Sequence, residues 1–368
     1  MEEKITPSPK NGFQLISKYR GALMGIASIW VFVFHAWISV FPEPQTQFLQ
    51  TMADIELFVR KLGYTGVDTF LLLSGMGLTY AIKKEPLLKF YYRRIRKVIL
   101  PFAVAAVISF FVMGWDTATF VGNITGFNFY AKHINCFCWF VPAIITLYLF
   151  FPLYWKVFDK VSNKFVVTGF ALLIWLMLTF LFSGTIRYDL FGFTNRIPVF
   201  LIGILFGYIA QNKSSKPFKA THYLVVFLVF LLGLFLEYIY IFKGFSLVLP
   251  EEKVFVPNCV LQCSMPFLIS KILDILDSHC GKFGKAVTAV FGFWGTFTLE
   301  MYCSYACLLV PFFTPVVLAL KDHGFGRLGV NIAVFAATSL VSWLASLAFK
   351  YFWKLVELPF GKKKEQKA

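Results

Sequence analysis

His35 is the strongest candidate for chemistry in this sequence, because it lies inside a long apolar stretch. The 21 residues from Gly21 to Phe41 carry no formal charge and could cross a bilayer core as a helix. Arg20 precedes them, and fifteen residues of helix place His35 about 22 Å further on, in the outer half of the membrane. A neutral imidazole can accept a hydroxyl proton near neutral pH, so we predict a general base. The alternative is a packing histidine that hydrogen-bonds a neighbouring helix.

Asp68 is the second candidate. It follows Gly66 and lies just inside the outer end of the next apolar stretch, at a depth similar to that of His35. A carboxylate there could orient the imidazole and stabilise its charged form. The alternative is a carboxylate that is favoured at the start of a helix by the helix dipole.

A cluster of four cations in five residues is the third candidate, and it immediately precedes another apolar stretch. Guanidinium groups bind phosphates through two parallel hydrogen bonds, so the cluster could hold a nucleotide-like or pyrophosphate-bearing donor. Anchoring of the chain at the inner membrane surface is the alternative. The predicted donor-binding residues, with Arg20 included, are Arg20, Arg93, Arg94, Arg96 and Lys97.

The composition places these residues in a membrane protein. Of the 368 residues, 58% are hydrophobic and only 15% are charged, whereas soluble domains carry about a quarter charged residues. The net charge of +16 is spread over loops that fall mostly on one side of the predicted spans. It therefore indicates topology and contact with anionic membrane lipids, and it argues against nucleic acid as a partner.

We predict an all-α bundle of about ten transmembrane helices with both termini in the cytoplasm. The excess of Lys and Arg on the side of the termini sets this orientation. Residues 1–20 are the cytoplasmic N-terminus, 21–350 the transmembrane domain and 351–368 a basic cytoplasmic tail. The predicted spans are 21–41, 64–82, 98–115, 137–157, 165–183, 196–211, 222–242, 254–272, 297–319 and 329–349.

Six motifs in this order resemble the acyltransferase 3 family of integral membrane acyltransferases. They are Gly25 with Phe34-His35-Ala36, Gly66-Val67-Asp68 with Ser74-Gly75, Phe90-Tyr-Tyr-Arg93-Arg94 with Leu100-Pro101, Trp139-Phe140 with Tyr148 and Pro152, Arg196-Ile-Pro198 with Gly203, and Leu299-Glu300-Met-Tyr302. Two positions depart from the family pattern. Met24 stands where the family commonly has an arginine, with Arg20 one turn earlier, and Tyr305 stands where a histidine is common.

The resemblance implies transfer of an acyl group, usually acetyl, from cytoplasmic acyl-CoA to a hydroxyl at the outer face. The acceptor would be a surface glycan or a lipid-linked sugar. His35 falls on the family's essential first-span histidine, and Arg93, Arg94 and the cations after them fall on its basic donor-binding motif. The motifs also suggest substrate-binding residues, namely Trp139, Tyr148, Arg196, Glu300 and Tyr302.

We therefore expect a multi-pass O-acyltransferase of a bacterial-type plasma membrane, most simply an O-acetyltransferase. Its donor substrate would be acetyl-CoA or another acyl-CoA, and no metal is expected. Direct transfer needs only the base His35, oriented by Asp68, and a covalent acyl-histidine intermediate is the other route. A proton-coupled transporter or flippase of a lipid-linked or anionic solute is the alternative function. The sequence is compatible with a homo-oligomer.

Overall fold

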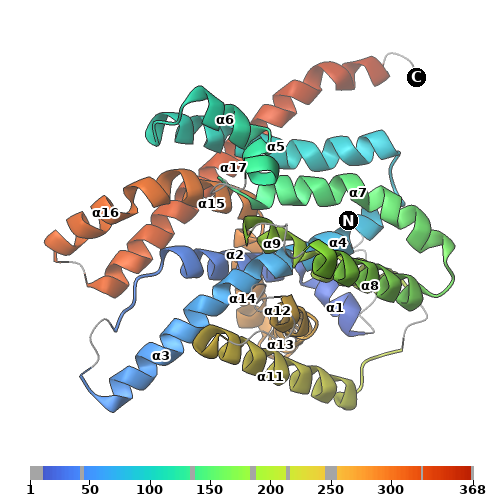
Figure 1. The fold of residues 1–368 in the computed structure, drawn as a ribbon, viewed down its shortest axis with the longest axis horizontal. Coiled ribbons are helices and arrows are strands. Elements are labelled where there is room, and N and C mark those ends of the chain that lie inside the picture. Colours follow the sequence, from blue (N-terminus) through green and yellow to red (C-terminus); the bar gives the residue numbers. More distant parts are fainter. Residues whose placement is uncertain are drawn as a thin grey trace.

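The computed structural model describes residues 11–41, 45–132, 137–182, 188–212, 216–244, 255–324 and 326–365. Within these ranges the regular structure is helical and no strand occurs, which confirms the all-α prediction (Figure 1). The helices before residue 135 are α1 (Gly12–Lys18), α2 (Arg20–Ala36), α3 (Gln47–Leu62), the 3₁₀ turn η1 (Gly63–Thr65), α4 (Gly66–Ile82), α5 (Leu87–Val112), α6 (Thr117–Ile124) and the π turn η2 (Asn128–Lys132).

The remaining helices complete the bundle. They are α7 (Phe140–Lys160), α8 (Lys164–Phe182), α9 (Tyr188–Thr194), α10 (Ile197–Gln211), α11 (Ala220–Lys243), α12 (Phe255–Gln262), α13 (Met265–His279), α14 (Gly281–Trp294), α15 (Thr298–Ser304), the π-helical segment η3 (Tyr305–Leu309), α16 (Val310–Asp322) and α17 (Arg327–Glu365).

Seven helical segments in the described part of the chain are long and apolar enough to cross a membrane. They are Leu87–Val112, Phe140–Lys160, Lys164–Phe182, Gly192–Gln211, Ala220–Lys243, Val256–His279 and Arg327–Glu357. The helices α1 and α2 together make an eighth if they are one span, although they are bent by 72°. The protein is thus a multi-pass helical membrane protein, and the expected count of ten spans is not confirmed.

Two of the predicted spans, 64–82 and 297–319, do not form a continuous helix long enough to be counted among these candidates. The stretch 64–82 begins with the 3₁₀ turn η1, which leaves α4 with 17 residues. The stretch 297–319 is divided by η3, where the backbone changes from α to π geometry. The regular α-helical rise is therefore interrupted in both stretches.

The helices α4 and α10 form the most extensive pair in the core. Glycines make this close approach possible, because a Cβ on Gly75 would meet the backbone of Phe200 and one on Gly203 would meet the backbone of Leu72. Small residues let helix backbones touch in this way in membrane bundles. The pair fixes α4, which carries Asp68, against the rest of the core.

Glu56 of α3 ties down the chain that follows α2. Its carboxylate accepts hydrogen bonds from Trp37 Nε1 at 2.8 Å, Ser39 Oγ at 2.8 Å and the Val40 amide at 2.9 Å. Burial alone would raise the pKa of Glu56, but these hydrogen bonds outweigh it and hold the pKa below its ordinary value. The helix α3 is not among the candidate spans. These hydrogen bonds therefore anchor the His35 end of α2 to a helix that is not itself a candidate span.

The long helix α17 runs antiparallel to α2. Near its start, Asn331 exchanges two hydrogen bonds with the backbone of Ile38, at 2.9 and 2.8 Å. Near its other end, Glu357 is ion-paired with Arg96 of α5. The helix passes residue 350 without a break, and Figure 1 shows it crossing the molecule towards the C-terminus. Part of the predicted tail 351–368 therefore continues the last span as helix.

Candidate active site

A cavity of about 600 Å³ lies between α2, α4, α5, α7, α15, η3 and α17. Arg20 and His35, at the two ends of α2, both line it. Because the sixteen positions from Arg20 to His35 belong to one helix, the cavity extends about 22 Å along α2. The two predicted functions, phosphate binding and proton transfer, therefore occur at opposite ends of one space.

The His35 end of the cavity is aromatic. The His35 ring lies 4.7 Å from the ring of Tyr305 and 4.8 Å from that of Phe34, measured between centroids. The side chain is exposed to the cavity, and in the described part of the chain no side chain or backbone group hydrogen-bonds its imidazole nitrogens. The imidazole is thus free to bond with a molecule that enters the cavity.

Tyr305 reaches His35 because the helix changes geometry there. It is the first residue of the π-helical segment η3, directly after α15. Single π turns within helices often occur at functional sites, since they redirect one side chain. The sequence marked Tyr305 as a departure from a family pattern, and the structure places this residue against the predicted base.

The other end of the cavity is strongly basic. Arg20 donates from Nε to the Leu73 carbonyl at 3.2 Å. The guanidinium of Arg94 lies over the Phe90 ring, 5.8 Å from its centroid, and its buried Nε has no hydrogen-bond partner among the described residues. Tyr148 also lines the cavity and is within electrostatic reach of both arginines. An unpaired guanidinium donor in a basic cavity is suited to binding an anion.

The structure separates the four predicted cations of α5. Arg94, Arg96 and Lys97 line the cavity, whereas Arg93 does not. Arg93 is half-exposed and forms an ion pair with Glu85, which precedes α5. Arg93 therefore lies apart from the three cations that line the cavity. The four cations lie within five helical positions, which span more than one turn, so they cannot all face one side.

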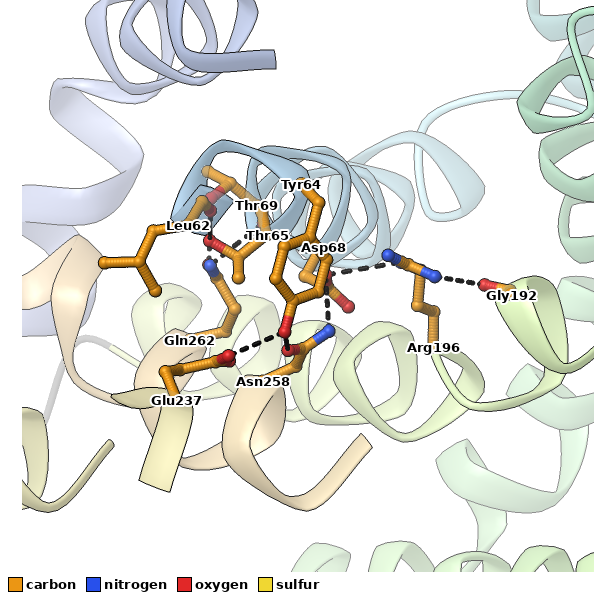
Figure 2. A network of polar contacts seen from close by, with 10 residues as sticks. All are labelled: Leu62, Tyr64, Thr65, Asp68, Thr69, Gly192, Arg196, Glu237, Asn258 and Gln262. Atoms are coloured by element: carbon orange, nitrogen blue, oxygen red, sulfur yellow. Dashed lines mark hydrogen bonds and ion pairs between the residues drawn. The ribbon is translucent and has the colours of Figure 1, made fainter. Parts of the chain in front are cut away.

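Asp68 belongs to a separate, buried network (Figure 2). Its Oδ2 accepts from Arg196 Nε at 3.3 Å and from Asn258 Nδ2 at 3.1 Å, and the side chain is completely buried. It does not line the cavity that contains His35. The predicted Asp68–His35 pair is therefore absent from the contacts that the structure describes, and Asp68 instead joins α4 to α10 and α12.

The network continues from Asn258 through Tyr64 to Glu237 of α11 (Figure 2). The Tyr64 hydroxyl lies 2.6 Å from Glu237 Oε2 and 2.9 Å from Asn258 Oδ1. The Tyr64 hydroxyl has one proton to donate, and the Glu237 carboxyl and the Asn258 amide oxygen are its two acceptors. The buried Arg196–Asp68 ion pair is thus linked through Asn258 and Tyr64 to the carboxyl of Glu237.

The predicted substrate-binding residues divide between the two sites. Tyr148, Glu300 and Tyr302 line the cavity. Trp139 and Arg196 do not, because the Arg196 guanidinium lies over the Trp139 ring at 5.4 Å and also donates to the Gly192 carbonyl. With Asp68 as its third partner, Arg196 is held outside the cavity. Among the described residues, no group of three or more His, Cys, Asp or Glu side chains could hold a metal.

A protein-family model described as an acyltransferase domain, that of the acyltransferase 3 family, matches residues 22–348. The chain belongs to the acyltransferase 3 family. This membership confirms the resemblance and identifies a membrane acyltransferase, and it does not favour a transporter. Neither the curated proteins nor the solved structures gave a match.

The matched acyltransferase 3 domain contains His35 of α2 and the cavity-lining cations of α5, whereas Arg20 lies just before it. The cavity extends beyond the matched segment, since Phe349, Lys350, Trp353, Lys354 and Glu357 also line it. Sequence reasoning missed these five residues. Their spacing of three and four along one helix was the available signal, but the predicted boundary between the transmembrane domain and the basic cytoplasmic tail divided them at residue 350.

Proposed function

We propose that this acyltransferase 3 protein moves an acyl group, most simply acetyl, from cytoplasmic acyl-CoA to a hydroxyl of a glycan or lipid-linked sugar. The observation that carries the proposal is the shared cavity, which has the phosphate-binding cations at one end and His35 at the other. The CoA nucleotide would bind at the basic end, which would face the cytoplasm. The pantetheine arm would follow α2 and bring the thioester to His35.

The proposed chemistry is one acyl transfer. The acceptor hydroxyl oxygen attacks the thioester carbonyl carbon, and His35 takes the hydroxyl proton as the C–O bond forms. The C–S bond then breaks, and the imidazolium returns the proton to the departing thiolate, which leaves as free CoA thiol. The imidazole nitrogens have no partner among the residues that the structure describes, so they are available to accept a proton from a substrate.

The surroundings of His35 support a base without a carboxylate partner. Tyr305 and Phe34 hold the ring by packing. The carboxyl that the sequence assigned to this task is engaged by Arg196 and Asn258. A direct transfer therefore rests on His35 alone, and Tyr305 is a positioning residue.

The test supplies radiolabelled acetyl-CoA to inverted membrane vesicles that contain the protein, and counts the label in the lipid and polysaccharide fractions. His35→Ala should reduce transfer by about 10²–10⁴-fold, which is the usual contribution of a general base. CoA affinity, measured by calorimetry on the purified protein, should stay the same. The matched control is His279→Ala, because His279 lies at the end of α13 and does not line the cavity.

Two outcomes would contradict the proposal. Transfer by His35→Ala at the wild-type rate would remove His35 from the chemistry. Solute uptake by proteoliposomes that hold no acyl donor would favour the transporter alternative. Label that stays on purified, acid-quenched protein would reveal an acyl-histidine intermediate in place of direct transfer.

A further inference from the structure

The segment 349–357 of α17 forms one wall of the basic end of the cavity. Asn331 fixes the start of α17 beside Ile38, and nineteen further residues place Lys350 about 28 Å along the helix. Arg20 lies at a similar distance from Ile38 along α2. Lys350 and Lys354 therefore meet the basic end, and both line the cavity.

Spacing along α17 puts the chemical groups of this wall on one face. Lys350 and Lys354 are four residues apart, and Trp353 and Glu357 lie one turn from them, so their side chains are neighbours on a helix. The outward face carries Tyr351, which is 64% exposed and does not line the cavity. The segment thus presents two ammonium groups and an indole ring to the same space as the arginines.

Trp353 stands in an aromatic and cationic cluster. The Arg96 guanidinium lies 5.7 Å from the Trp353 ring and 5.3 Å from the Tyr92 ring, and these two rings are 6.4 Å apart in an edge-to-face arrangement. Glu357 holds Arg96 through an ion pair. A flat ring next to fixed cations is the arrangement that stacks a nucleobase while its phosphates are bound.

The charges of the cavity fit a nucleotide with several phosphate groups. Its lining contains six cations and two carboxylates, namely Arg20, Arg94, Arg96, Lys97, Lys350, Lys354, Glu300 and Glu357. The 3′-phosphate and diphosphate of CoA carry about four negative charges near neutral pH, because the second pKa of a phosphomonoester is about 6. Without the two lysines of α17 the lining would have too few cations to balance this ligand.

We propose that residues 349–357 form a nucleotide-binding wall of the donor site, in which Trp353 stacks on adenine and Lys350 and Lys354 bind the phosphates. The proposal rests on acyl-CoA being the donor, as argued above. It assigns donor recognition to a segment outside the matched acyltransferase domain. It further predicts that the wall distinguishes a full CoA thioester from a thioester that lacks the nucleotide.

The test compares acetyl-CoA with S-acetylpantetheine, which keeps the arm and the thioester but has no nucleotide. Lys350→Gln with Lys354→Gln, and separately Trp353→Ala, should raise the KM for acetyl-CoA about tenfold or more. The KM for S-acetylpantetheine should not change. Lys160→Gln and Tyr351→Ala are the matched controls, since neither residue lines the cavity, and both should behave as wild type.

Binding of adenosine 3′,5′-bisphosphate, measured by calorimetry, gives a readout that needs no acyl transfer. Wild type should bind it, the lysine pair variant should lose about tenfold in affinity, and Trp353→Phe should retain more affinity than Trp353→Ala. Thermal unfolding of each variant in detergent identifies any that fail to fold, and Trp353→Phe keeps a ring in the cluster with Arg96.

Each result decides between the claims. An equal rise in the KM for acetyl-CoA and for S-acetylpantetheine, or an unchanged KM for both, would overturn the proposal that this segment binds the nucleotide. Failure of wild type to bind the bisphosphate while it still transfers acetyl from acetyl-CoA would also overturn the wall and leave the proposed function intact. Selective loss of bisphosphate binding in the variants, without any acetyl transfer by wild type, would support the wall and overturn the proposed function.

Discussion

Arg93 and Arg94 are adjacent in sequence, and the structure predicts opposite outcomes when each is replaced by Ala. Arg94 lines the cavity with a buried Nε that lacks a partner. Arg93 points elsewhere and pairs with Glu85 in a partly exposed ion pair. Arg94→Ala should therefore weaken donor binding, and Arg93→Ala should leave it unchanged.

The magnitude follows from the bond that Arg94 would make. A hydrogen bond to a charged group contributes about 1.5–3 kcal/mol, and about 1.4 kcal/mol is a factor of ten in affinity. Arg94→Ala should therefore raise the donor Kd roughly tenfold to a hundredfold. Arg94→Lys should restore only part of this, because an ammonium group cannot make the paired bonds of a guanidinium. Exposed ion pairs contribute about 0.2–1 kcal/mol to stability, so Arg93→Ala should barely shift thermal unfolding.

The assay is calorimetric titration of CoA into each purified variant, together with the KM for acetyl-CoA in vesicles. Protease protection of the termini checks that each variant has inserted with the wild-type topology, since a loss of positive charge can alter topology. Equal effects of the two substitutions, or a larger effect of Arg93→Ala, would refute the assignment of Arg94 to the cavity. Unchanged CoA affinity in both would return the whole cluster to a membrane-anchoring role.

Two further predictions concern the groups that hold the site in place. Asp68→Asn leaves the buried Arg196 without its counter-ion, so it should lower the free energy of unfolding by about 3–5 kcal/mol. The affinity for CoA should be retained. Normal stability together with a loss of acyl transfer would instead give Asp68 a chemical role. Glu56 has a lowered pKa, so its carboxylate stabilises the fold above the unfolded pKa, and this stabilisation is lost as the pH falls through the folded pKa. Thermal unfolding at decreasing acid pH should therefore fall more steeply in wild type than in Glu56→Gln, and parallel curves would contradict this.

The sequence alone could identify Arg20, His35 and Arg94, because each lies within or beside an uncharged apolar stretch. A histidine in an uncharged span and a run of cations at the edge of another apolar stretch are visible without any knowledge of packing. The positions of Arg20, Arg94 and His35 around one cavity agree with those signals. The all-helical fold was predictable for the same reason, since long apolar stretches permit few other structures in a membrane.

The partner of Asp68 could not be predicted, because it depends on contacts between distant segments. Asp68 and Arg196 are 128 residues apart, and at the level of sequence either could have faced His35. The choice was made by the packing of α4 against α10, which brings their start regions together. The count of ten spans is not confirmed for a different reason, since hydropathy does not detect a π turn or a 3₁₀ turn inside an apolar stretch.

The uninterrupted helix α2 fixes the distance between the basic end of the cavity and His35. Arg20 and His35 belong to the same rigid element, so motions between helices cannot change the distance between the anion-binding end and the base. One residue inserted between them would lengthen the interval by about 1.5 Å and rotate His35 by about 100°, away from Tyr305. Four inserted residues would nearly restore the direction of the imidazole but would move it about 6 Å further from the cations. In the proposed reaction, the number of residues between Arg20 and His35 would set the length of the donor, and a small acyl compound such as acetyl phosphate would be too short to occupy both ends.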